Sequence, residues 1–227
     1  MFLKLNINLL YLCKMKKNCK TLLFLFCFTL VAGITHAQAK FGIKIGGNAS
    51  TLLGFEKFYN LDLSEANQIN TSMMFRYHAG LSLDVSVGKL FLRPELEFVE
   101  QGVAAKYKSE NEQTDASNYK MHYLKLPVHI GYKHVLNMDT DLRFGIGGYA
   151  SYYLGGDKSF ENLKVKKLDY GLSVIAALDY VRTSTSLSYE YGLEDIVGAD
   201  SWSTFKKENK LPSIRNTCLK LSVAYYF

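Results

Sequence analysis

The chain has 227 residues, of which 27 are lysine or arginine and 21 are aspartate or glutamate, for a formal net charge of +6. Five lysines and no acidic residue lie in the first 37 residues, so the rest of the chain carries 22 basic and 21 acidic side chains. This near balance excludes a strongly basic, nucleic-acid-binding surface, and the length suits one domain.

Residues 1–37 have the features of a signal peptide that is cleaved after export. Three lysines between residues 16 and 20 precede an apolar run over residues 22–32, which is too short to span a bilayer comfortably. The small residue Ala37 favours cleavage before Gln38, with a second possible site after Ala39. Met15 is an alternative first residue. The competing interpretation of the segment is a membrane anchor.

The cysteines follow the same division. Cys13, Cys19 and Cys27 lie in the leader, and only Cys218 remains in residues 38–227. A single cysteine can form neither an internal disulfide bond nor a cysteine metal site. Residues 38–227 show no helical period, linker or break in composition, so they are expected to form one all-β domain.

Alternation of apolar and polar residues predicts eight β-strands. The expected strands are 40–50, 74–87, 90–103, 121–135, 141–154, 169–181, 184–193 and 215–227. Long loops are expected at 51–72, 104–120, 155–168 and 194–213, and short turns at 88–89, 136–140 and 182–183. Pro94 falls on the apolar side of its strand, which predicts a bulge or distorted pairing there.

The last strand shows the two faces most clearly. Its apolar face is uninterrupted and consists of Leu219, Leu221, Val223, Tyr225 and Phe227. A water-exposed edge strand would not normally carry such a face to its last residue, whereas a strand between lipid and a polar lumen would. We therefore expect an eight-stranded antiparallel up-and-down transmembrane β-barrel, preceded by a cleaved signal peptide.

The connections support this prediction. Long loops at one rim and tight turns at the other are typical of bacterial outer-membrane barrels, and an even number of strands returns both termini to the short-turn, periplasmic rim. The alternative is a soluble eight-stranded barrel of the lipocalin type. In that arrangement the apolar faces would line a cavity and the charged faces would meet water.

The polar faces of the strands contribute six cations, five anions and one histidine to the expected lumen. These residues are Lys44, Asp84, Arg93, Glu95, Glu97, Lys125, His129, Lys133, Arg143, Asp179, Glu190 and Lys220. The lumen of an eight-stranded barrel is narrow enough to be filled by side chains, and charges inside it need partners. Because the two signs nearly balance, we expect a salt-bridge network that plugs the lumen and leaves little conductance.

No catalytic, cofactor or metal site is expected. The histidines His78, His122, His129 and His134 occur without a G-x-S-x-G or H-E-x-x-H motif. A single histidine in a strand is more often a hydrogen-bonded structural residue than a catalytic one. Outer-membrane lipid is the expected partner, and the lysines of the long loops suit anionic lipopolysaccharide.

Six segments carry a resemblance to a known family. They are a leader ending in His-Ala-Gln, FGIKIGGNAS, GLSLDVSVGKLFLRPELEFVEQG, YLKLPVHIGYK, GIGGYASYYLGG and LKLSVAYYF. Together they resemble the PorT-like outer-membrane β-barrel family of Bacteroidota over essentially all of residues 38–227. The resemblance implies an eight-stranded barrel in the outer membrane and no catalytic residues. The closing segment is similar to the signal that the barrel assembly machinery recognises.

The function expected from these features is that of an integral outer-membrane barrel with a structural or accessory role. The namesake of the family is linked to type IX protein secretion, so the resemblance implies secretion-system proteins as partners, or a part in envelope assembly. A small porin or passive channel is the first alternative. A lipid-modifying or proteolytic outer-membrane enzyme is the second.

Overall fold

The computed structural model describes residues 38–55, 69–108, 114–156, 165–196 and 213–227. The chain divides into two compact units, residues 1–39 and residues 40–227, and the second holds the barrel. The expected signal peptide lies outside the described residues, as do the central parts of the four long loops. Among the described residues, no helix is both long and apolar enough to cross a bilayer.

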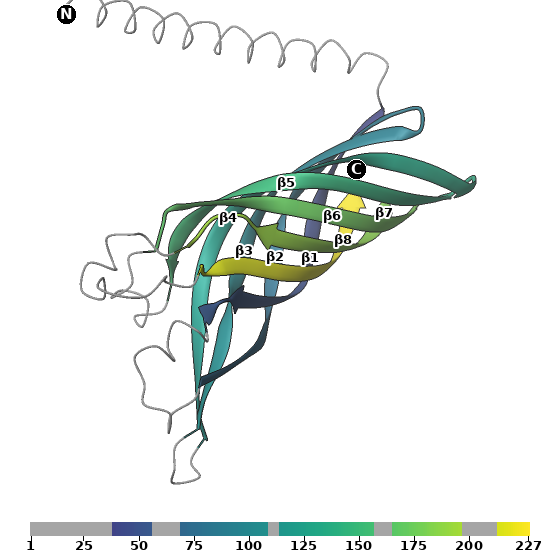
Figure 1. The fold of residues 1–227 in the computed structure, drawn as a ribbon. Coiled ribbons are helices and arrows are strands. Elements are labelled where there is room, and N and C mark those ends of the chain that lie inside the picture. The colour runs from purple at the N-terminus through teal and green to yellow at the C-terminus, as the bar shows by residue number, and fades with distance from the viewer. Residues whose placement is uncertain (1–37, 56–68, 109–113, 157–164, 197–212) are drawn as a thin grey trace, which may run out of the picture. The chain divides into compact units, whose positions relative to one another are not determined.

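Eight antiparallel strands follow one another around a closed barrel, and β8 pairs with β1 (Figure 1). The strands are β1 (Gln38–Leu53), β2 (Ile69–Val87), β3 (Leu90–Lys108), β4 (Thr114–Asn137), β5 (Thr140–Gly156), β6 (Leu168–Tyr180), β7 (Thr183–Gly192) and β8 (Arg215–Tyr226). The predicted fold class is therefore confirmed.

Three of the expected strand boundaries are wrong by five residues or more. Most of the loop expected at residues 104–120 is strand, because β3 and β4 stay paired as far as Lys108 opposite Thr114. Strand β2 also begins earlier than expected, at Ile69. The alternation of side chains fades in these extensions while backbone pairing continues. Figure 1 shows β2, β3 and β4 running well past the neighbouring strand ends at the long-loop end.

The short turns are nearly as expected. Gly88 has a positive φ of 59°, which suits the tight turn between β2 and β3. The turn between β6 and β7 is made by Val181 and Arg182 rather than by Arg182 and Thr183, because Thr183 already pairs with Tyr180. Val181 has a φ of 53°, a value that few β-branched residues adopt. Its side chain gave no indication of a turn.

Pro94 does not shift the strand register. The pairing of β3 with β2 and with β4 keeps the same register on both sides of this residue, so no bulge forms there. The ladder with β2 is nevertheless interrupted opposite Pro94, between the pairs Ser82–Glu95 and Val85–Leu92, which is the distorted pairing that the sequence also predicted. The one register shift between β2 and β3 lies between Met73 and His78. There, four residues of β2 face three of β3, which is a β-bulge.

The two faces of the sheet have opposite character. The five apolar residues of the closing strand all point outward and are exposed, from 41% for Tyr225 to 68% for Phe227. Alternate residues of the same strand, including Lys220, are buried. A continuous apolar outer surface is stable in hydrocarbon and not in water. The lipocalin-type arrangement is therefore excluded.

Candidate functional site

The middle of the lumen holds a chain of alternating charges, which we name the central ion chain. Its members come from β1, β3, β4, β7 and β8, all with inward-facing parity, and their side chains are almost completely buried. The nitrogen–oxygen distances are Lys44–Glu95 2.8 Å, Lys44–Glu97 2.8 Å, Lys220–Glu97 2.6 Å, Lys220–Glu190 2.5 Å and Lys125–Glu190 2.7 Å. Three lysines and three glutamates make the chain neutral.

A second group of charges closes the short-turn end, and we name it the rim ion cluster. Arg143 lies 2.6 Å from both Asp84 and Asp179. Arg93 lies 2.9 Å from Asp84 and 3.4 Å from Asp179. The ring of Phe91 lies 5.3 Å from the Arg143 guanidinium. Two arginines and two aspartates make this cluster neutral as well.

Two further residues of the expected network lie apart from these groups. The ring nitrogen Nε2 of His129 is 2.8 Å from the Ser173 hydroxyl, and Nδ1 is 4.0 Å from Glu95. Lys133 sits at the turn rim, where its amine is 3.8 Å from Asp141 and partly exposed. Ten of the twelve charged and histidine residues thus lie in the two clusters.

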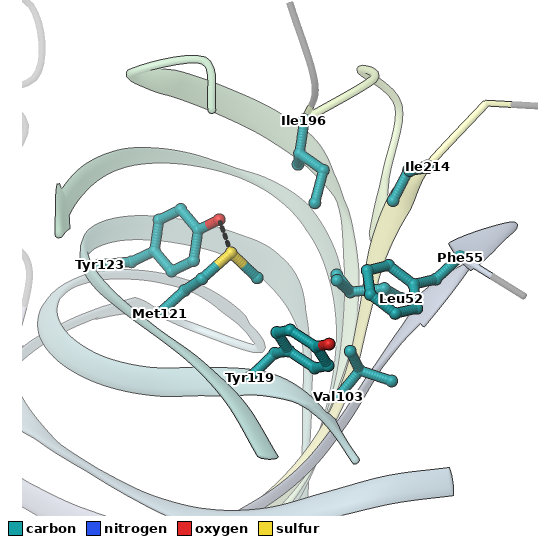
Figure 2. Packing of buried hydrophobic residues seen from close by; sticks show 8 residues of the cluster. All are labelled: Leu52, Phe55, Val103, Tyr119, Met121, Tyr123, Ile196 and Ile214. Atoms are coloured by element: carbon teal, nitrogen blue, oxygen red, sulfur yellow. Dashed lines mark hydrogen bonds between the residues drawn. The ribbon is translucent and has the colours of Figure 1, made fainter. Parts of the chain in front are cut away.

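A third region fills the lumen at the long-loop end, and we name it the apolar cluster. It consists of Leu52, Phe55, Val103, Tyr119, Met121, Tyr123, Ile196 and Ile214 (Figure 2). The Tyr123 hydroxyl donates a hydrogen bond to the Met121 sulfur at 3.4 Å. Backbone hydrogen bonds from Lys166 to Ile196 and from Ile196 to Ile214 hold the loop ends over this cluster.

The sequence reasoning missed the apolar cluster, because seven of its eight members fall in expected loops or at the ends of expected strands. A signal was nevertheless present. Tyr119, Met121 and Tyr123 share the inward parity of Lys125, so β4 could have been extended toward residue 119. Phe55 and Ile196 lie outside the strands and gave no such signal.

A polar layer separates the apolar cluster from the central ion chain. Asp169 accepts hydrogen bonds from Asn216 at 2.8 Å and from the Tyr149 hydroxyl at 3.4 Å. The Lys125 amine lies 4.3 Å from the centre of the Tyr149 ring, which links this layer to the central ion chain. Asp169 has the same parity as Asp179 and could have been added to the expected network.

Two serine–histidine pairs lie within the lumen. His78 is 2.8 Å from the Ser222 hydroxyl, and His129 is 2.8 Å from that of Ser173. All four residues are buried, at 1–2% exposure. The Glu95 carboxylate that would complete a triad with His129 is 4.0 Å away and contacts Lys44. These hydrogen bonds hold side chains in place within the lumen, and a substrate has no path to Ser173 or Ser222.

His122 has a different environment from the buried histidines. It lies on the outer face of β4, stacked on Phe98 with ring centres 5.8 Å apart, and its Nδ1 is 3.9 Å from Glu100. No nucleophile among the described residues contacts it. The described part of the chain also has no group of three or more His, Cys, Asp or Glu side chains that could hold a metal ion.

Two cavities in the described part of the chain bear on access to the lumen. One lies at the short-turn mouth beside Asp84, Arg143 and Tyr226 and has a volume of about 10 Å³, which is roughly the space of one water molecule. The other, of about 460 Å³, is an apolar depression lined by the outward-facing Phe144 and Ala176. Neither forms an aqueous path through the barrel.

A family model described as "outer membrane protein beta-barrel domain" matches residues 36–198 of the chain. Among solved structures, Neisserial surface protein A is 14% identical with a TM-score of 0.41, and the match covers 84% of this chain and 99% of that one. OprG of Pseudomonas aeruginosa is 10% identical, with a TM-score of 0.42 and 84% and 95% coverage. Ail of Yersinia pestis is 11% identical, with a TM-score of 0.37 and 84% and 99% coverage. No curated protein sequence matches the chain.

Proposed function

The chain belongs to the family of outer membrane protein β-barrel domains and resides in the bacterial outer membrane, and on that premise we propose that it is a closed barrel with a structural or accessory role. It neither conducts ions nor catalyses a reaction. The role we propose is in type IX protein secretion or in envelope assembly, as the resemblance to the PorT-like family implies.

The filling of the lumen is the observation that carries the closed-barrel proposal. From the short-turn end, an ion would meet the rim ion cluster, the central ion chain, the polar layer around Asp169 and then the apolar cluster. Each charged group is already paired, so an entering ion would have to displace a partner. The apolar cluster offers no ligand to replace an ion's hydration shell.

We propose that the barrel has no enzymatic activity because its serine–histidine pairs are buried in the filled lumen. Ser173 and Ser222 are hydrogen-bonded to histidines but lie among buried charges. A hydrolase would need its nucleophile within reach of a substrate and beside oxyanion donors. His122, on the outer face, contacts an aromatic ring and a carboxylate.

The closing strand supports recognition by the barrel assembly machinery. Its outward residues form a row that ends at Phe227, whose backbone donates a hydrogen bond to Phe41 at 2.8 Å. The rings of Phe41 and Phe227 are stacked with centres 6.4 Å apart. The row therefore lies beside the joint between β1 and β8 that closes the barrel.

Planar-bilayer recording tests the closed lumen. The purified barrel is expected to give no stable unit conductance at ordinary salt. The combined variant Lys220→Ser, Glu97→Ser and Met121→Ala, which opens both the central ion chain and the apolar cluster, serves as the control that should raise conductance. Large, stable conductance steps from the unmodified barrel would exclude the closed-barrel proposal and favour the porin alternative.

Deletion in the native bacterium tests the cellular role. If the role is in secretion, type IX cargo should disappear from the medium while the outer membrane stays intact. If the role is in envelope assembly, sensitivity to detergent should rise while secretion continues. A deletion strain unaffected in both respects would exclude the proposed role, and restoring the gene is the control.

A further inference from the structure

The bulge between β2 and β3 opens a gap in the backbone ladder, which we name the seam. It comprises residues 74–77 of β2 and residues 100–102 of β3. Side chains of β1 supply hydrogen bonds to β3 here. Asn48 donates to the Glu100 carbonyl at 2.9 Å, and the Ser50 hydroxyl both donates to the Gly102 carbonyl at 3.0 Å and accepts from its N–H at 2.8 Å.

The seam changes where a charged side chain of β2 points. Arg76 has the parity of the lumen-facing residues His78 and Ser82, yet its Nε lies 2.8 Å from the Glu100 carboxylate. Glu100 has the parity of the outward-facing residue Phe98 and is opposite His122, which stacks on that ring. The extra residue in β2 therefore brings a guanidinium to the outer face of the barrel.

This position lies at the edge of the apolar outer band. On β3 the outward-facing positions from Leu90 to Phe98 are apolar, and Glu100 occupies the next outward-facing position. A transmembrane strand needs about 9 to 11 residues to cross the hydrocarbon, so Glu100 falls where lipid headgroups begin. The long loops follow at this end, which is the cell-exterior side of such barrels.

The surroundings of Arg76 are amphipathic. Its neighbours Phe75 and Tyr77 are 76% and 57% exposed. The Arg76 side chain is more exposed than that of Glu100, so the pair presents its positive member to the membrane surface. Nε faces Glu100 and Nη1 donates to the Phe75 carbonyl at 3.0 Å, which fixes the plane of the guanidinium.

We propose that the seam is a lipopolysaccharide-binding site in which the Arg76 guanidinium holds a lipid phosphate and the acyl chains lie over Phe75, Tyr77 and Phe98. Because Nε and one N–H of Nη1 already face protein groups, Nη2 and the second N–H of Nη1 are the donors that the guanidinium offers to a phosphate oxygen. Exposed aromatic rings beside it favour acyl chains over a hydrated polymer. This inference goes beyond the closed barrel and does not depend on whether the lumen conducts.

The test uses the barrel in phosphatidylcholine nanodiscs, titrated with fluorescently labelled lipopolysaccharide. Arg76→Gln should weaken binding about tenfold, the loss expected for one charge-assisted hydrogen bond. The matched control is Arg215→Gln, since Arg215 also lies at the long-loop end of its strand but donates to Tyr191 and Ser213. The control should bind as the unmodified barrel does.

Three outcomes would overturn the assignment. Equal losses of affinity in Arg76→Gln and Arg215→Gln would show that binding depends on the overall charge of the barrel and not on the seam. Undiminished binding after the phosphates are removed from the lipopolysaccharide would exclude phosphate recognition. Equal competition by phosphatidylglycerol would assign the site to phospholipid instead. Heat-modifiable migration on gels shows that each variant is folded, and Arg76→Lys, which keeps the charge without the planar group, should bind with intermediate strength.

Discussion

The central ion chain and the apolar cluster fill the same lumen in opposite ways. The ion chain uses three lysines and three glutamates, each within 2.8 Å of a partner. The apolar cluster uses eight uncharged side chains from strands and loop ends. The first depends on every partner being present, because an unpaired buried charge is very costly. The second depends on volume, because a missing group leaves a cavity.

The largest effect is expected from removing one cation of the central ion chain. Lys220→Met leaves Glu97 and Glu190 facing each other without the amine that contacts both. The free energy of unfolding should fall by about 3–5 kcal/mol. Urea unfolding in lipid vesicles, followed by circular dichroism, measures this loss.

Lys133→Met is the control for that measurement. Lys133 is partly exposed and 3.8 Å from its partner, so its loss should cost less than about 1 kcal/mol. Equal effects of the two substitutions would contradict the idea that burial makes the central charges interdependent.

A smaller loss is expected in the apolar cluster. Met121→Ala removes a fully buried side chain beside Tyr123 and should lower the free energy of unfolding by about 2–4 kcal/mol. The bilayer should remain free of conductance steps, because the central ion chain below is intact. Conductance in this variant would show that the apolar cluster alone keeps the lumen closed. Met138→Ala, at a fully exposed turn, is the matched control.

The seam provides an intermediate case, in which single polar side chains replace backbone pairing. Ser50→Ala removes both hydrogen bonds to Gly102 and should cost about 1–2 kcal/mol. Hydrogen exchange at the Gly102 amide should accelerate as well. Ser72→Ala, at an exposed position of β2, is the control. Unchanged exchange at Gly102 would mean that another group protects it.

The smallest effect concerns an ion pair outside the lumen. Two hydrogen bonds, the stronger influence from Lys166 and the weaker from Tyr170, hold the pKa of Glu194 below its ordinary value. A lowered pKa stabilises the fold above the ordinary carboxyl pKa, and this contribution disappears as the pH falls through the lowered value. Carboxyl-carbon NMR should show the low midpoint, and Lys166→Met should raise it. An ordinary midpoint in the unmodified chain would contradict the pairing.

Sequence reasoning succeeded where a local period was sufficient. Lys44, Lys125 and Lys220 could be assigned to the inner face because strand parity is visible within a few neighbouring residues. It failed where backbone pairing continues beyond the regular alternation of apolar and polar residues, as in the expected loop that contains Tyr119. The sequence analysis assigned Arg76 to neither face, and its parity alone indicates the lumen. Only the bulge between β2 and β3 brings that side chain to the outer face.

The amino-acid sequence by itself determined the number of strands, the two faces of the sheet and the near balance of inward charge. These properties follow from side chains that alternate every two residues. The tertiary structure alone decided which charges meet, such as Lys220 and Glu97, which are 123 positions apart. Partners in a closed barrel depend on the register summed over all eight strands, and a shift of one residue in one strand changes them.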